Sequence, residues 1–474
     1  MYRKKNRQVQ VEEITISLEK LVPEKHILRE IDKAIDFSFI YEEVEGLYSE
    51  KGRPGIDPVS LFKIIFIQYL FGIRSMRQTI REIEVNVAYR WFIGYSLTEP
   101  VPHFSTFGKN YVRRFAGTDI FERIFKRILE EAQKSGYVDA SAVFIDSTHI
   151  KASANKHKSK EVKVTKPIKQ YQQELEAEIN ELRLADGKKK INPAQPEEAV
   201  KKVSTTDPDS GLFVKGEHER CFAYSTQTAC DKNGFVLGFE VSAGNVHDGQ
   251  LFHELYKKLD LSKTQTVTVD AGYKTPGVVR EIFLSGKIPA VPYTRPKTKD
   301  GFFRKSEYVY DEYFDCYLCP QNQVLEYTTT NREGYREYKS NPYICKNCPC
   351  RENCTLSKNM TKVILRHFWA KYMEEAEHLR HFPLIRDTYK KRKETIERVF
   401  ADAKERHCLR YTNYRGLAKV KVHICLIFSC LNLKKLARRK RINFTIFLPY
   451  LLLLTKNKVK SPPSVILRRV LSTS

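Results

Sequence analysis

The sequence lacks an apolar run long enough to cross a membrane. The most apolar stretch near the C-terminus, residues 444–454, contains Pro449 and falls far short of the roughly 20 residues that a membrane helix needs. No apolar stretch follows the first basic residues, so we expect no secretory signal peptide. These absences predict a protein of the reducing cytoplasm with no membrane partner.

Acidic residues are scarce relative to basic ones. The 474 residues include 57 Asp and Glu against 82 Lys and Arg, which gives a formal net charge of +25. Basic residues run through the whole chain, and each one that neutralises a phosphate releases counterions. Nucleic acid is therefore the favoured partner, although charge alone is also compatible with a merely basic protein.

Internal repeats are also absent, and the hydrophobic pattern divides the chain into parts. Residues 1–135 are expected to form an all-helical domain, because apolar positions recur three and four apart, as between 61 and 72. Residues 136–437 alternate strand and helix signals, which predicts an α/β domain with a mixed sheet. Residues 438–474 continue no pattern and are expected to form a basic and apolar tail of unknown role.

Within the α/β domain, strands are expected at 142–146, 221–230, 235–241, 264–269 and 288–293, and a helix at 278–284. The strands at 221–230 and 235–241 flank an Asp-Lys-Asn-Gly turn and are expected to form a hairpin. Residues 156–220 are expected to form a helix near 171–184 and a linker. Residues 295–365 are rich in Cys and Tyr with little periodicity, which indicates a small cysteine-rich insertion.

Two aspartates follow apolar strand residues. Asp146 comes after Ala-Val-Phe-Ile, and Asp270 comes after Thr-Val-Thr-Val, so both are expected at strand ends. A buried carboxylate is costly without a partner, whereas two such groups side by side bind a divalent cation well. Each aspartate taken singly can also be a turn or cap residue.

Glu397 borders the apolar face of an expected helix within 383–437. Lys393 and Lys404 lie four residues before it and seven after it, on the same stripe of that helix. An acid flanked by basic groups suits a site for a metal ion and a phosphate. The alternative is a solvated stripe of ordinary ion pairs.

Six of the eleven cysteines fall between 316 and 354, which favours metal binding over a disulfide framework. Two CxxC pairs, Cys316 with Cys319 and Cys345 with Cys348, are a strong zinc signal. These four are the favoured ligands of a structural Zn²⁺, with Cys354 as a possible substitute for any of them. Incidental free thiols are the alternative.

Five sequence blocks occur in order along the chain. They are Phe144-Ile-Asp146-Ser-Thr-His-Ile-Lys-Ala, Val269-Asp270-Ala-Gly-Tyr, Glu397-Arg398-Val-Phe with Lys404, Leu409-Arg-Tyr, and Tyr414-Arg415-Gly-Leu. Together with the N-terminal segments at 52–58, 74–77 and 90–94, they resemble bacterial insertion-sequence DDE transposases over roughly residues 15–437. In that family a helical domain precedes the catalytic domain, which implies a role in DNA binding or dimerisation for residues 1–135.

The resemblance implies an RNase H-like catalytic domain in which Asp146, Asp270 and Glu397 hold two Mg²⁺ or Mn²⁺ ions. It implies DNA cleavage and strand transfer at the ends of an insertion sequence, with the terminal inverted repeats and a target DNA as partners. A homo-oligomer, most simply a dimer, would pair the two ends, in a bacterial cytoplasm at the nucleoid. The candidate DNA-binding residues are Lys404, Arg398, Arg392, Lys393, Arg415, Arg74 and Arg77.

One departure from the family signature affects these assignments. The family places a Tyr and an Arg seven and four residues before the Glu, but those positions hold Lys390 and Lys393, while Tyr389 and Arg392 each lie one residue earlier. Arg392 and Lys393 are therefore both candidates for the upstream basic group. Two other functions fit the same features, namely a zinc-containing DNA-binding regulator and a metal-dependent nuclease that cuts without joining.

Overall fold

The computed structural model describes residues 15–49, 55–165, 171–185, 187–193, 195–196, 198–215 and 219–456, without the side chains of Asp248 and of residues 443–456. The chain divides into two compact units. Unit 1 consists of residues 1–137, 406–408 and 425–474, and unit 2 of residues 138–405 and 409–424. The chain thus returns to its first unit near the C-terminal end, which the sequence pattern did not indicate.

Unit 1 is helical, as expected. Its central helix, α4 (Pro58–Leu70), begins with Pro58 in the first turn and with Asp57 as N-cap, whose carboxylate accepts a hydrogen bond of 2.7 Å from the Ser60 backbone N–H. Nearly all of α4 is buried. The helices on either side of it in the sequence are α1 (Leu18–Leu21), α2 (Ile27–Ala34), α3 (Phe39–Val44), α5 (Met76–Val85), α6 (Val87–Ile93), α7 (Ser105–Asn110) and α8 (Ile120–Lys134), of which α3, α5 and α6 pack against α4.

The last described helix, α17 (Leu417–Lys456), runs without a break past residue 437. From residue 425 it belongs to unit 1, where the Cys425 thiol donates to the Phe121 carbonyl (3.1 Å) and the Lys440 ammonium to the Ala34 carbonyl (2.7 Å). The expectation that no pattern continues beyond 437 was therefore wrong up to Lys456, and residues 457–474 lie outside the described part. None of the helices described is long and apolar enough to span a membrane.

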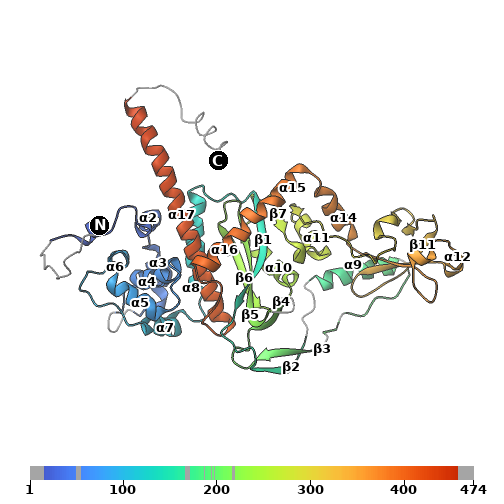
Figure 1. Cartoon of the computed structure of the whole chain (residues 1–474), viewed down its shortest axis with the longest axis horizontal. Coiled ribbons are helices and arrows are strands. Elements are labelled where there is room, and N and C mark those ends of the chain that lie inside the picture. The colour runs from blue at the N-terminus through green and yellow to red at the C-terminus, as the bar shows by residue number, and fades with distance from the viewer. Residues whose placement is uncertain are drawn as a thin grey trace, which may run out of the picture. The chain divides into compact units, whose positions relative to one another are not determined.

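Unit 2 is built on an eight-stranded mixed sheet (Figure 1). Its order is β2-β3-β4-β5-β1-β7-β8, and β6 pairs with the second half of β5. The parallel pairs are β1 with β7 and β7 with β8, whereas β5 runs antiparallel to β1 and to β6. The strands are β1 (Ala142–Lys151), β2 (Ser159–Thr165), β3 (Glu198–Ser204), β4 (Gly211–Lys215), β5 (Glu219–Cys230), β6 (Val236–Ala243), β7 (Thr266–Val269) and β8 (Ile288–Ala290).

Side chains alternate across β1 and so separate a core face from a polar face. Val143 and Ile145 join a buried cluster that includes Phe252 of α10 (Asp248–Lys258) and Val279 of α11 (Pro276–Leu284). The intervening positions point to the opposite face. Asp146 lies on that opposite face, directly across from the buried Thr228 of β5.

The linker expected within 156–220 contains strands. The helix near 171–184 is confirmed as α9 (Gln172–Ala185), but β2 and β3 on either side of it form an antiparallel pair, and β4 connects that pair to β5. The sequence concealed these strands because their exposed positions carry Lys and Glu, as an edge hairpin does.

The segment expected to lack periodicity, 295–365, forms a second, antiparallel sheet of order β13-β12-β11-β10-β9. Its strands are β9 (Val309–Asp311), β10 (Cys316–Leu318), β11 (Val324–Thr330), β12 (Tyr335–Ser340) and β13 (Val363–His367), with the short helices α12 (Pro342–Lys346) and α13 (Arg351–Cys354) between β12 and β13. The chain then returns to the main sheet through α14 (Ala370–Leu379), whose Ala376 joins the core beside α11. The second sheet is therefore inserted between β8 and α14 (Figure 1).

Candidate active site

The two aspartates lie next to each other because of the strand register. The parallel ladder of β1 and β7 ends with the pairing of Ile145 and Val269, so the next residue on each strand is an aspartate. Asp270 directly follows β7, as expected. Asp146 was expected at a strand end but lies within β1, which continues to Lys151 in its pairing with β5.

The third acid approaches from a helix. Glu397 lies in the first turn of α16 (Ile396–Arg406), which follows α15 (Pro383–Lys390) and the short 3₁₀ helix η5 (Lys391–Glu394). Thr395, between η5 and α16, has φ −107° and ψ −90°, so the helix is interrupted there. The interruption changes which side chains of this segment share a face.

The Arg392 guanidinium joins all three acids. Its Nη2 lies 2.5 Å from Asp146 Oδ2 and 4.0 Å from Asp270 Oδ2, and its Nη1 lies 3.2 Å from Glu397 Oε1. The second oxygen of each aspartate is bound locally, because Asp146 Oδ1 accepts from the Ser147 backbone N–H (2.8 Å) and Asp270 Oδ1 from the Gly272 N–H (2.9 Å). Oxygens from three separate elements thus converge on one cation.

The charge state of Asp146 reflects its burial. Only 8% of the residue is exposed, and this burial raises the pKa of the carboxyl to about 6 even though Arg392 acts in the opposite direction; the neighbouring Asp270 raises it further. Burial also lowers the pKa of Lys404, helped by Arg410 and Lys215 and opposed by Asp146. Lys404 therefore lies within electrostatic reach of the acids, on the same helix as Glu397.

The structure distinguishes between the two candidates for the upstream basic group. Arg392 faces the acids with 17% of its side chain exposed, whereas Lys393 lies on the surface. In an uninterrupted α-helix, residues five apart point about 140° away from each other. Arg392 and Glu397 meet because η5 and Thr395 interrupt the helix, which accommodates the one-residue shift in the signature.

The acids have suitable chemistry for a divalent ion but not a suitable spacing. Carboxylate oxygens are the ligands that Mg²⁺ prefers. Among the described residues, however, no group of three or more His, Cys, Asp or Glu side chains is close enough to hold a metal ion. Arg392 occupies the point on which the three acids converge.

The other basic candidates differ in their surroundings. Arg398 and Arg415 are exposed in unit 2, and the Arg415 Nε donates to the Ser153 carbonyl (3.1 Å). In unit 1, Arg74 and Arg77 are exposed at the start of α5, where the Arg77 guanidinium lies 4.4 Å from the centre of the Phe104 ring.

Two features near these candidates are not evident from the sequence. Arg90 is buried, and its guanidinium donates to backbone carbonyls, including that of Ser96 (2.8 Å), so its role is structural. Asp207 and Asp209 were not singled out, yet their carboxylates accept from the backbone N–H groups of Gly416 (3.0 Å) and Leu417 (2.8 Å) and so fix the block around Arg415. The sequence signal for this role was the Asp-Pro-Asp turn at 207–209, within the segment that was expected to be a linker.

Cys354 and Cys316 of the insertion have different surroundings. Burial raises the pKa of the Cys354 thiol, and Cys345 and Cys319 lie near enough to raise it further. Cys316 is buried on β10, and the groups that raise its pKa besides burial are carboxylates, including Asp311. All eleven cysteines are free thiols.

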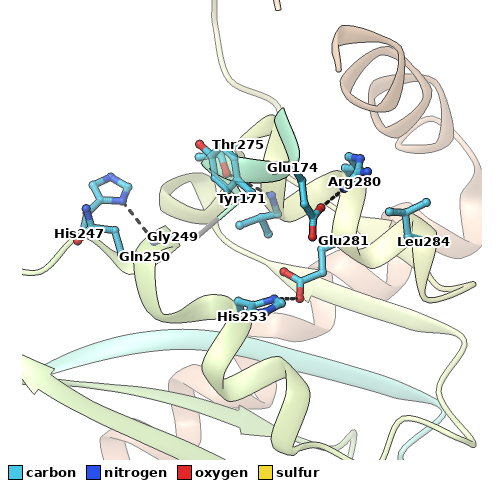
Figure 2. A pocket seen from close by; sticks show the side chains of 12 residues that line it. Tyr171, Glu174, His247, Gly249, Gln250, His253, Thr275, Arg280, Glu281 and Leu284 are labelled. Atoms are coloured by element: carbon cyan, nitrogen blue, oxygen red, sulfur yellow. Dashed lines mark hydrogen bonds and ion pairs between the residues drawn. The ribbon is translucent and has the colours of Figure 1, made fainter. Parts of the chain in front are cut away.

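A separate cleft of about 420 Å³ lies between α9, α10 and α11, and none of the three acids lines it. Figure 2 shows its ion pairs, in which His253 meets Glu281 and Arg280 meets Glu174 (2.9 Å). His247 at its rim is the N-cap of α10 and accepts from the Gly249 backbone N–H. This is the geometry of a helix-capping turn at His247; the Asp248 side chain lies outside the described part.

Comparison with known families supplies the remaining evidence. Residues 16–113, in the helical unit, match a family described as a transposase domain, and residues 318–437 match one described as a transposase DDE domain. This chain belongs to the DDE transposases. The second match includes Arg392 and Glu397 but begins after Asp146 and Asp270, whose place in the site rests on the strand register.

The transposase has no match among curated proteins or solved structures. Its family nevertheless implies DNA as the partner and a general dependence on divalent metal ions.

Proposed function

We propose that this transposase cleaves DNA at the ends of an insertion sequence and joins those ends to a target, with Asp146, Asp270 and Glu397 as its metal-binding acids. The observation that carries the proposal is the convergence of the three carboxylates, from β1, from the end of β7 and from α16, on the single Arg392 guanidinium. A structural ion pair with Arg392 would need only one carboxylate, so the presence of three favours a metal site.

The strand order supports an RNase H-like fold for the catalytic domain. Around the acids the order is β6-β5-β1-β7-β8, in which β1, β7 and β8 are parallel and β5 is antiparallel to its neighbours. The acids occupy the centre of this sheet, one on β1 and one directly after β7, the strand beside it.

The chain's own groups have distinct roles in this proposal. Bound Mg²⁺ or Mn²⁺ would activate a water or a DNA 3′-hydroxyl and stabilise the leaving oxygen of an in-line displacement at phosphorus. Asp146, Asp270 and Glu397 would present carboxylate oxygens to these ions from a rigid sheet and a helix. Lys404, Arg398 and Arg415 would hold nearby phosphates, because cationic side chains position a nucleic-acid backbone without reading its sequence.

Unit 1 would recognise the terminal inverted repeats through Arg74 and Arg77, both exposed at the start of α5. A homodimer would pair the two ends, since joining needs both ends at one target. A helical module that only dimerises is the alternative for unit 1.

We further propose that the insertion holds a structural Zn²⁺ through Cys319, Cys345, Cys348 and Cys354. This set exchanges Cys316 for Cys354, because Cys345 and Cys319 act electrostatically on the Cys354 thiol, whereas the charged groups that act on Cys316 are carboxylates. Four thiolates around zinc leave no open position, so the role would be structural.

A strand-transfer assay tests the catalytic proposal. Donor duplexes carrying the element's ends, mixed with a target plasmid and Mg²⁺, should give joined products with the wild type and none with Asp270→Asn or Glu397→Gln, while gel-shift binding of the end duplex persists. Arg77→Gln should weaken that binding. Cut donor without joined product would indicate a nuclease, and unchanged function of the acid variants would indicate a regulator.

A further inference from the structure

The acid cluster carries more negative charge than its partner neutralises. Three carboxylates contribute −3 and Arg392 contributes +1, which leaves −2 at a site where Asp146 is buried. Uncompensated buried charge is costly, so a cluster built for stability alone would carry fewer acids or more cations. If Arg392 leaves, the three acids carry −3, a charge that divalent cations can neutralise.

We propose that Arg392 occupies the place of the metal ions while the transposase is free of DNA, and that it leaves the acids when a DNA phosphate offers its guanidinium another anion. This inference rests on the proposed function, because it takes the three acids to be the metal ligands. It makes Arg392 a positioning residue that couples metal binding to DNA binding.

The first support is that guanidinium and metal need the same oxygens. Asp146 Oδ1 and Asp270 Oδ1 are already bound to backbone N–H groups, so the two Oδ2 atoms face the shared space, and both lie within 4.0 Å of Arg392 Nη2. Glu397 offers Oε1 to Nη1. A metal ion cannot reach these atoms until the guanidinium moves.

The second support is that Arg392 is incompletely satisfied where it lies. Its buried Nε has no hydrogen-bond partner among the described residues. Arginine in a permanent structural role normally uses its donors fully, and a phosphate offers the bidentate partner that suits its planar fork.

The third support is the segment that carries Arg392. The short 3₁₀ helix η5 lies between α15 and α16, and Thr395 interrupts the helical backbone directly after it. Short 3₁₀ stretches between α-helices often act as hinges. A change in η5 could therefore turn Arg392 toward DNA while Glu397 stays on α16.

Calorimetric titration of the DNA-free full chain with Mn²⁺ tests this inference. We expect Arg392→Gln to bind Mn²⁺ about tenfold or more tightly than the wild type, within the usual range of coupling between sites. Lys393→Gln is the matched control, because it removes the same charge from the adjacent, exposed position and should change the affinity by less than about twofold. Arg392→Lys, whose single ammonium cannot bridge three acids, should give an intermediate value and serves if Arg392→Gln does not fold.

Adding Glu397→Gln to each protein separates this inference from the proposed function. If Arg392→Gln binds like the wild type while Glu397→Gln weakens both, the acids hold the metal but Arg392 does not exclude it, and the inference fails alone. If Glu397→Gln changes Mn²⁺ binding in neither, the acids are not the metal site and both fail. Equal tightening by Lys393→Gln would also overturn the inference, because it would reduce the effect to general charge.

Discussion

The two sheets of unit 2 differ in how their carboxylates are paired. In the main sheet, three carboxylates share the single guanidinium of Arg392. In the second sheet, the single carboxylate of Asp315 is shared by three donors: the hydroxyls of Tyr310 (2.8 Å) and Tyr338 (2.7 Å) and the guanidinium of Arg336. In the main sheet the acids outnumber their cationic partner, whereas in the second sheet both oxygens of Asp315 accept hydrogen bonds.

The difference indicates what each sheet is for. The main sheet has an apolar core that includes Val143, Phe252 and Val269, which can stabilise the fold while the opposite face of the sheet carries a costly acid cluster. The second sheet has a small core rich in tyrosine, whose hydroxyls need partners when buried. Its ionic group therefore stabilises the structure, whereas the acids of the main sheet are, under the proposed function, metal ligands.

The largest expected effect concerns the proposed zinc site beside the second sheet. Cys354→Ser should abolish zinc in the purified protein and loosen this sheet, because a structural zinc contributes folding free energy directly. Cys316→Ser should retain zinc close to the wild-type content. Elemental analysis by mass spectrometry measures both. Zinc lost from Cys316→Ser but retained by Cys354→Ser would restore Cys316 to the ligand set and contradict this prediction.

A smaller effect tests whether the acid cluster lowers the free energy of unfolding of the metal-free protein. Asp146→Asn should stabilise the metal-free protein at pH 7, because burial raises the pKa of Asp146 from 3.8 to about 6 and a shift of this size is worth about 3 kcal/mol. A raised pKa gives a contribution to stability that is fully present below pH 3.8 and is lost as the pH rises through 6. The gain from Asn should therefore shrink as the pH falls from 6 toward 4.

Denaturant unfolding in EDTA at several pH values measures this gain. Glu394→Gln, at an exposed acid on η5, is the matched control and should change the free energy of unfolding by less than about 0.5 kcal/mol. A wild type more stable than Asp146→Asn at pH 7 would mean that Arg392 balances the cluster after all, and the contrast between the two sheets would fail.

The smallest effect tests the balanced cluster. Asp315→Asn should destabilise the second sheet by about 1–3 kcal/mol, because hydrogen bonds to a charged acceptor exceed those to a neutral one. Asn is the appropriate replacement, since Asp315 has φ +47° and Asn tolerates that left-handed conformation. Hydrogen exchange of the β10–β12 amides measures the change, with Asp300→Asn on the surface as control. Unchanged protection would show that Asp315 is dispensable.

Much of this architecture was readable from local patterns. The helices of unit 1, the hairpin of β5 and β6, and the strand before each aspartate follow from periodicity and turn residues, because these signals depend on neighbouring residues alone. The edge strands β2 and β3 were missed, since exposed charged strands resemble linkers. The tyrosine-rich second sheet was missed because its short strands bury few apolar side chains.

Motif and strand position in the sequence were enough to single out Asp146, Asp270 and Glu397 as candidate acids. The sequence could not show that these acids share one guanidinium, nor that Arg392 rather than Lys393 provides it; the folded chain shows both. The physical reason lies at Thr395. In a continuous helix, the one-residue shift of the arginine would turn its side chain away from Glu397. The helix is interrupted at Thr395, so Arg392 reaches Glu397, and the sequence pattern does not reveal this interruption.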